Sequence, residues 1–71
     1  MNLYNVKLNY KGEVHDIHTM AVSHDQAKEF AIQRVAKALQ LRKTSPIKQF
    51  IKGGPGRIES KFIRSYPDIE A

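Results

Sequence analysis

The sequence predicts an α+β fold in the order β-β-α-α-β, in which one long helix packs on one face of a small antiparallel β-sheet and a second helix is short. Three observations predict this fold: alternating apolar and polar residues near the N-terminus, a helix-capping motif followed by helically spaced apolar residues, and a short amphipathic run before a glycine-rich loop. A chain of 71 residues is long enough for one domain with a compact core. We expect residues 1–67 to form this domain and residues 68–71 to be a frayed acidic tail.

The N-terminal part of the chain predicts a β-hairpin. Large apolar side chains recur at every second position, namely Tyr4, Val6, Leu8 and Tyr10. This period of two predicts a strand with one buried face. Lys11 and Gly12 then supply a tight turn, because glycine tolerates positive φ, and a second strand follows over residues 13–22.

The second strand has a mixed phase. One face carries Ile17, Thr19 and Ala21, and the apolar residues of the other face are Val14 and Met20. Two explanations stay open from the sequence: a β-bulge near residues 15–16, or partial burial of both faces.

A long helix is predicted over residues 24–41. Ser23 begins a capping box, because its hydroxyl can accept from the amide of Gln26 while the Gln26 side chain reaches back to the start of the helix. The apolar positions on one side of this helix are Ala27, Phe30, Ala31, Val35, Ala38 and Leu41. Their spacing predicts a face that packs on the sheet, with Arg42 and Lys43 favourably placed at the negative end of the helix dipole.

A short helix and a third strand are predicted beyond this point. Ser45 as the N-cap and Pro46 at the first helical position begin the helix, and Gly53 ends it. In the segment 57–66, the residues that share one face are Ile58, Phe62 and Tyr66. A helix would also fit this spacing of four, but the β-branched and aromatic content favours a strand.

Basic residues are concentrated in the second half of the chain. Of the twelve lysines and arginines, nine fall between Arg34 and Arg64 against Glu59 alone, a formal charge of +8, whereas residues 1–33 sum to −1. A clustered positive field attracts polyanions at long range, which evenly spread charges do not. The charge pattern therefore predicts an anionic partner without naming an activity.

Several classes of function receive no support from the residues. The chain has no cysteine, His15 and His18 point to opposite faces of the predicted strand, and His24 lies at the start of the helix. Two of these histidines are expected at exposed positions, and we expect no metal site and no cofactor. No nucleophile with an adjacent base and no carboxylate pair of predictable geometry is present, so we expect a protein that is not an enzyme. The N-terminus does not resemble a signal peptide and no apolar run is long enough to span a membrane, so we expect a cytoplasmic protein without a membrane partner.

The loop between Lys52 and Arg57 is a candidate anion site. Glycine amides approach phosphates closely, and here Gly53, Gly54 and Gly56 lie between two basic residues. The G-x-x-G spacing also matches the loop with which KH domains clamp a nucleic-acid backbone, although that loop joins two helices. The alternative is a helix stop and a turn, which is ordinary glycine and proline chemistry.

We expect the basic side chains to converge on one edge around this loop and to contact the backbone of RNA or DNA, with an affinity that falls as salt rises. The predicted nucleic-acid-binding residues are Lys37, Arg42, Lys43, Lys48, Lys52, Gly53, Gly54, Gly56, Arg57, Lys61 and Arg64. Possible edge contacts to bases are Tyr4, Tyr10 and Tyr66. One alternative is a protein-interaction module whose basic edge binds an acidic surface of a host nucleic-acid-processing enzyme. Another is a small homo-oligomer, instead of a monomer, formed by pairing of sheet edges.

A sequence pattern covers residues 4–53. It reads Tyr4-x-Val6, then His18-Thr19-x-Ala21-x-Ser23-x-x-Gln26-Ala27-x-x-x-Ala31, then Val35-Ala36-Lys37-x-Leu39 and Ile47-x-x-Phe50-x-x-Gly53. This pattern resembles that of short uncharacterised accessory proteins of tailed bacteriophages. The resemblance implies a protein that acts in the cytoplasm of the infected bacterium and binds nucleic acid or a host component that processes it. It implies no particular catalytic or binding residue.

Overall fold

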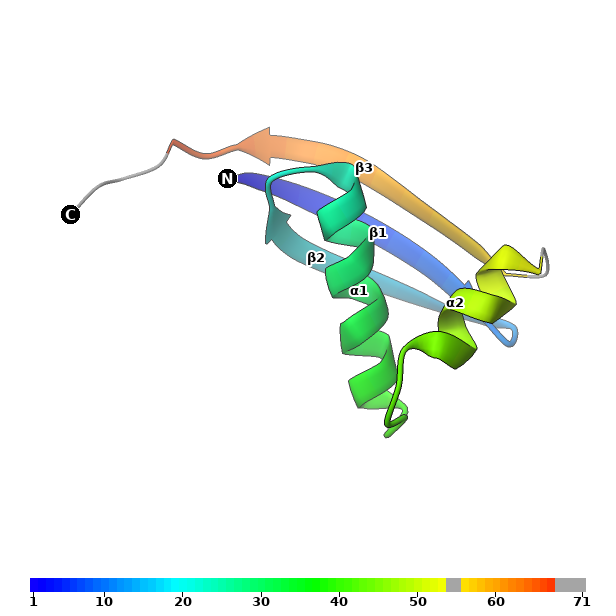
Figure 1. The fold of residues 1–71 in the computed structure, drawn as a ribbon. Helices are drawn as coiled ribbons and strands as arrows, with labels where there is room; N and C mark the ends of the chain where they lie inside the picture. The colour runs from blue at the N-terminus through cyan, green and yellow to red at the C-terminus, as the bar shows by residue number, and fades with distance from the viewer. Residues whose placement is uncertain (54–55, 68–71) are drawn as a thin grey trace.

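The computed structural model describes residues 1–53 and 56–67 and confirms the β-β-α-α-β order. The strands are β1 (Asn2–Tyr10), β2 (Glu13–Ala21) and β3 (Arg57–Ser65), and the helices are α1 (His24–Ala38) and α2 (Ser45–Lys52). The sheet is antiparallel with the strand order β2-β1-β3, and both helices lie on the same face of it (Figure 1). We call the other side of the sheet the outer face. The predicted frayed tail lies outside the described residues.

The predicted hairpin is confirmed. β1 and β2 pair in unbroken register along their whole length. The two residues between them, Lys11 and Gly12, have φ angles of 51° and 82°. Positive φ at both central residues is the requirement of a type I′ turn, whose twist matches that of the strands it joins.

The mixed phase of β2 comes from the uncovered outer face. Its pairing with β1 runs without a shift through residues 15–16, so the bulge considered there is wrong. Thr19 and Ala21 are buried on the helix side, whereas Val14 is 65% exposed on the outer face. Partial burial of both faces is therefore also wrong for Val14, because no described helix covers that side.

The irregularity in the sheet lies instead in β3. Tyr4 pairs with Phe62, but its neighbour Leu3 pairs with Arg64, so Ile63 is an extra residue in β3. An extra residue of this kind is a β-bulge, and it inverts the alternation of side chains beyond it.

The bulge changes the face on which the end of β3 lies. Phe62 stays on the helix side, where its ring meets that of Tyr4 with centroids 5.9 Å apart. Arg64 lies on the outer face opposite Leu3, and its guanidinium carbon is 5.8 Å from the centroid of the Tyr66 ring. The prediction that Ile58, Phe62 and Tyr66 share one face is therefore wrong for Tyr66.

The start of α1 follows the predicted capping box with one change. The hydroxyl of Ser23 accepts from the amide of Gln26 at 3.2 Å. The side chain of Gln26 accepts from the amide of Val22 at 2.8 Å, one residue before the N-cap. The first bond satisfies an amide that an open helix end would leave without a partner, and the second ties the residue before the N-cap to the first turn of α1.

The helix α1 ends at Ala38, three residues before the predicted end at Leu41. Gln40 takes a left-handed conformation with φ 59°, and the amide of Leu41 donates to the carbonyl of Ala36 at 2.8 Å. This is the hydrogen-bond pattern of a Schellman motif. Leu41 thus leaves the helix and packs against the core, which accounts for its apolar character without a helical position.

The helix α2 starts one residue earlier than predicted. Its N-cap is Thr44, which makes no side-chain capping bond, and Ser45 is already helical. Gly53 ends the helix as expected, with its amide donating to the carbonyl of Gln49 at 2.8 Å.

Two groups of buried side chains form the core between the sheet and the helices. The first is Leu8, Tyr10, Ile32, Val35, Ala36 and Ile47, and the second is Tyr4, Val6, Ala21, Ala27 and Ala31. Ile17 and Ile58 pack against both groups and so join them. The small alanines of α1 allow the helix to lie close to β1, while α2 covers the hairpin end of the sheet (Figure 1).

Candidate functional site

The sheet divides the predicted basic residues between its two faces. Side chains alternate along a strand, and the Oγ atom of Ser60 in β3 lies 2.9 Å from Nδ1 of His24 in α1. Arg57 and Lys61 therefore point to the outer face, and the bulge places Arg64 there too. The structure does not bring these three side chains to the surface that carries the basic residues of the helices.

The outer face mixes cations with carboxylates. Lys7 pairs with Asp16 on one side and with Glu59 on the other. In the next position Asn5 lies between His18 and Lys61, and its amide donates to Asp16. Because the charges alternate across the strands, the positive field of this face is weakened by its own carboxylates.

The helix layer carries a basic cluster, which we define as Lys37, Arg42 and Lys43. All three side chains are exposed, at the end of α1 and in the connection that follows it. The chain has no carboxylate between Phe30 and Ile58. Within residues 1–53 and 56–67 no salt bridge is found for these three side chains, so their charge is uncompensated.

The two basic residues of α2 differ in their surroundings. The Nζ atom of Lys48 lies 2.8 Å from Oε1 of Glu29 in α1, in a salt bridge whose side chains are 47% and 43% exposed. Lys52 is the last residue of α2, at the end of the helix away from Arg42 and Lys43. A helix of eight residues is about 12 Å long. The charge of Lys48 is therefore compensated by that of Glu29, and Lys52 is separated from the basic cluster by the length of the helix.

The glycine-rich loop uses its described amides internally. The amide of Gly53 donates to Gln49, and that of Gly56 donates to the carbonyl of Phe50 at 3.3 Å. Gly56 is also buried, so that a Cβ there would lie 2.6 Å from the ring of Phe50. These two glycines end a helix and allow close packing, and their amides do not point at an anion. Gly54 lies outside the described residues.

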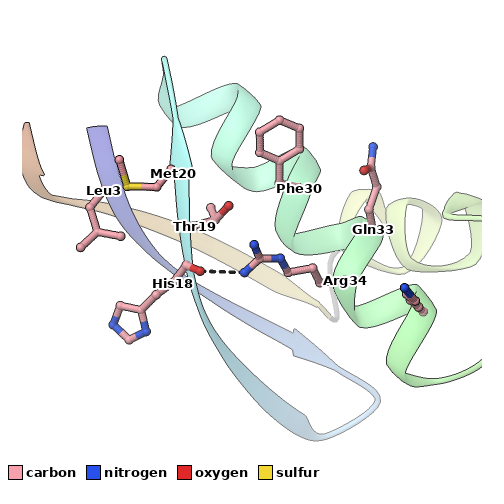
Figure 2. A pocket seen from close by; sticks show the side chains of 8 residues that line it. Leu3, His18, Thr19, Met20, Phe30, Gln33 and Arg34 are labelled. Atoms are coloured by element: carbon pink, nitrogen blue, oxygen red, sulfur yellow. Dashed lines mark hydrogen bonds between the residues drawn. The ribbon is translucent and has the colours of Figure 1, made fainter. Parts of the chain in front are cut away.

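A groove follows the edge of β2 beside α1. One part of it has a volume of about 490 Å³. The residues that line this part are Leu3, His18, Thr19, Met20, Phe30, Gln33, Arg34 and Lys37 (Figure 2). A second part, of about 390 Å³, is lined by Val14, His15, Asp16, Ile17, Arg34, Val35 and Ala38. Both parts share Arg34, so the groove runs along most of the exposed edge of the strand.

Arg34 bridges the groove. Its Nη1 atom donates to the backbone carbonyl of His18 at 2.7 Å, as Figure 2 shows. β2 is an edge strand, and its outward backbone groups have no neighbouring strand to pair with. The guanidinium of Arg34 thus satisfies one of these groups and places a positive charge at the middle of the groove.

The described residues hold neither a group of metal-ligating side chains nor a membrane-spanning helix. Among the described residues, no three His, Asp or Glu side chains gather in a way that would hold a metal ion. His15 lies on the helix side of β2, and its Nε2 atom is buried without a hydrogen-bond partner, 3.7 Å from Oε2 of Glu13. In the part of the chain that the structure describes, no helix is long and apolar enough to cross a membrane.

Comparison of the chain with protein-family models, with curated proteins and with solved structures finds no match. The resemblance to short phage proteins therefore stays an expectation. The fold and the chemistry of the surfaces carry the functional argument.

Sequence reasoning missed the groove and the position of Arg34 in it. Phe30 and Arg34 lie on the long helix and Met20 on the second strand, and their periodicities indicated only a core or a solvent face. A salt bridge from Lys48 to Glu29 was not predicted either. The sequence signal for the groove was the mixed phase of the second strand, in which the apolar Met20 lies on the face opposite to that of Thr19.

Proposed function

We propose that this protein is a small, non-enzymatic binding protein that contacts the backbone of RNA or DNA through the basic cluster. The single observation that carries the proposal is the absence of any carboxylate between Phe30 and Ile58, a stretch in which Lys37, Arg42 and Lys43 are exposed at and just after the end of α1. As an accessory protein of a tailed phage, which the resemblance implies, it would act in the host cytoplasm.

Electrostatics favour the helix layer over the outer face as the contact surface. On the outer face Lys7 has a carboxylate neighbour on each side, Asp16 in β2 and Glu59 in β3. A phosphate that approaches that face meets both signs of charge, whereas one that approaches the basic cluster meets only positive charge. We therefore assign backbone binding to Lys37, Arg42 and Lys43, with Lys52 as a more distant contact.

A structural role explains part of the cluster but not all of it. Lys37 lies in the last turn of α1, where a cation interacts favourably with the helix dipole. Arg42 and Lys43 follow the end of the helix and lie outside that turn, and both are exposed. Their charge is thus the part of the cluster that helix stability does not require.

The test compares two double variants with the same loss of charge. Arg42→Ala with Lys43→Ala removes two cations of the basic cluster, and Arg57→Ala with Lys61→Ala removes two from the outer face. Each reduces the formal net charge from +5 to +3. For a single-stranded oligonucleotide, we expect the first variant alone to make the slope of log affinity against log salt less negative, by about 1.4.

Three results would contradict the proposal. They are no binding of RNA or DNA at low salt, an equal loss in both double variants, and a loss confined to the outer-face variant. Unfolding curves of both variants serve as the control, and we expect them to match the parent protein because all four side chains are exposed. Equal binding of polyglutamate would instead support an acidic protein surface as the partner.

A further inference from the structure

The edge of β2 is a second binding surface, and its backbone is arranged to accept another strand. In a hairpin with a two-residue turn, the residues next to the turn exchange both hydrogen bonds, so the odd-numbered residues of β2 bond to β1. The even-numbered residues then direct their amides and carbonyls away from the sheet. The carbonyl of His18, which Arg34 reaches, is one of these groups.

Most of this edge is not covered. Among the described residues, Arg34 provides the hydrogen bond to His18, while no partner is found for the outward backbone groups of Val14, Asp16 and Met20. Pairing with β1 is regular over all nine residues of β2, without a bulge or a proline. A regular strand edge of this kind is a template for strand addition.

We propose that an extended, acidic segment of another protein binds in this groove and adds to the sheet as a fourth strand beside β2. The main chain of the segment would take the outward amides and carbonyls of β2. Its side chains would alternate between the helix side and the outer face, as they do in any strand.

The residues that line the groove indicate which side chains would suit the bound segment. On the helix side the groove presents Arg34 and Lys37 beside Gln33, and this part of it has no carboxylate in its lining. Carboxylates of the segment would lie there. On the outer side Met20 and Leu3 offer an apolar surface, which suits Val or Leu at the alternate positions.

A second copy of the chain is a poorer occupant than an acidic segment. Pairing of β2 with β2 around a two-fold axis places residue i of one copy opposite residue j of the other, and an axis near His18, in the middle of the groove, brings the Arg34 side chains of the two copies together. Arg34 and Lys37 of α1 would then face cations of the second copy, and like charges across an interface are repelled. The same positive charges attract a segment that carries carboxylates.

The other edge of the sheet is less suitable. β3 contains the bulge at Ile63, which interrupts regular pairing close to its end. Its edge also lies beside the start of α1, where His24 bonds Ser60. The regular edge with an adjacent lined groove is that of β2.

The experiment uses the full chain and synthetic peptides of about six residues, the usual length of a strand. One peptide alternates Glu with Val, a second alternates Lys with Val, and a third is the Glu peptide with its strand-pairing amides methylated. We expect the Glu peptide to bind at least about tenfold more tightly than the Lys peptide. We expect the Glu peptide to slow hydrogen exchange at the amides of Asp16 and Met20. The methylated peptide should neither bind nor slow this exchange.

A charge swap tests the assignment of the cations. In the Lys37→Glu variant, and more strongly with Arg34→Glu added, the preference should reverse toward the Lys peptide. Lys37→Glu keeps this test interpretable if loss of the Arg34 bond to His18 unfolds the protein, because the Lys37 side chain is exposed. Arg42→Ala with Lys43→Ala should bind the Glu peptide as the parent does, which separates this site from nucleic-acid binding by Arg42 and Lys43, the two members of the basic cluster outside the groove lining.

Four outcomes would overturn the proposal. The first is no preference for the Glu peptide. The second is binding that leaves exchange at Asp16 and Met20 unchanged or survives methylation. The third is protection of these amides in the protein alone as its concentration rises, which would assign the edge to a second copy. The fourth is protection of the same amides by an oligonucleotide that displaces the peptide, which would assign the groove to nucleic acid.

Discussion

Replacement of Gly56 by alanine should destabilise the domain by about 2 kcal/mol through a steric clash. A Cβ at this position would lie 2.6 Å from Cδ1 of Phe50 and 3.0 Å from the backbone carbonyl oxygen of Asn9. The backbone of Asn9 is held in the sheet between β2 and β3. The ring of Phe50 must therefore move.

The magnitude follows from what the ring loses. The Phe50 ring meets that of Tyr10 edge to face with centroids 5.1 Å apart. An aromatic pair of this kind contributes about 0.5 to 1.5 kcal/mol, and overpacking of a well-filled site costs about 1 to 3 kcal/mol. Among the described glycines only Gly12 has a positive φ, so alanine at position 56 adds no backbone strain to this cost.

The assay is urea unfolding followed by circular dichroism, with Gly12→Ala as the matched control. At Gly12 a Cβ meets nothing within 4 Å, but φ is +82°, so alanine there costs about 1 kcal/mol from the backbone alone. In a Phe50→Leu background the penalty of Gly56→Ala should fall by about 1 kcal/mol, because a shorter side chain yields more easily. The penalty of Gly12→Ala should not change.

Two results would refute this reasoning. One is a penalty for Gly56→Ala below about 0.5 kcal/mol, the range of ordinary surface substitutions. The other is a penalty of the same size in both Phe50 backgrounds. Nucleic-acid binding by folded Gly56→Ala protein should match the parent, since the amide of Gly56 donates to Phe50. A selective loss of binding would restore the glycine loop as an anion site.

Three further substitutions have expected outcomes. Gln40→Gly should raise the free energy of unfolding by about 0.5 to 1 kcal/mol in urea titrations, because Gln40 has φ 59° and glycine adopts this conformation without steric cost; a decrease would contradict the left-handed C-cap. His15→Leu should raise the free energy of unfolding by about 1 kcal/mol, because Nε2 is buried without a hydrogen-bond partner. A lower urea midpoint in this variant would show that the imidazole makes a stabilising polar interaction. Glu29→Gln should release Lys48 and tighten oligonucleotide binding about threefold in low-salt titrations, and unchanged binding would exclude Lys48 from the contact surface.

The elements with local signals were predictable from the sequence. The alternation in β1, the Lys11 and Gly12 turn, the capping box at Ser23 and the stop at Gly53 all depend on residues within one turn or one strand, and all are present. The end of α1 was predicted three residues too late. The apolar character of Leu41 fits a last helical position on the buried side, and it fits equally well a residue after the helix that packs into the core, as Leu41 does. Sequence spacing alone does not separate these two positions.

The distribution of charge was not predictable, because it depends on pairing between distant segments. The bulge at Ile63 exists only relative to the register with β1, and it decides on which face Arg64 and Tyr66 lie. Likewise, the charge of Lys48 is compensated by that of Glu29 only because α2 folds back against α1. Linear counting therefore treated as one surface what the fold separates into an outer face of mixed charge and a helix layer whose basic cluster has no carboxylate neighbour in sequence.

The cations that line the groove along β2 have a second expected effect: they oppose pairing of this strand edge with the same edge of another copy of the chain. Arg34 and Lys37 line an edge that is otherwise regular and uncovered, so their positive charge opposes β2 to β2 pairing as well as attracting carboxylates. Removal of both charges with Arg34→Ala and Lys37→Ala should therefore increase self-association, measured as a concentration-dependent mass by light scattering. Arg42→Ala with Lys43→Ala, which removes the same charge away from the edge, should leave the mass unchanged. Equal association of both double variants would mean that net charge, and not the cations beside β2, keeps this edge unpaired.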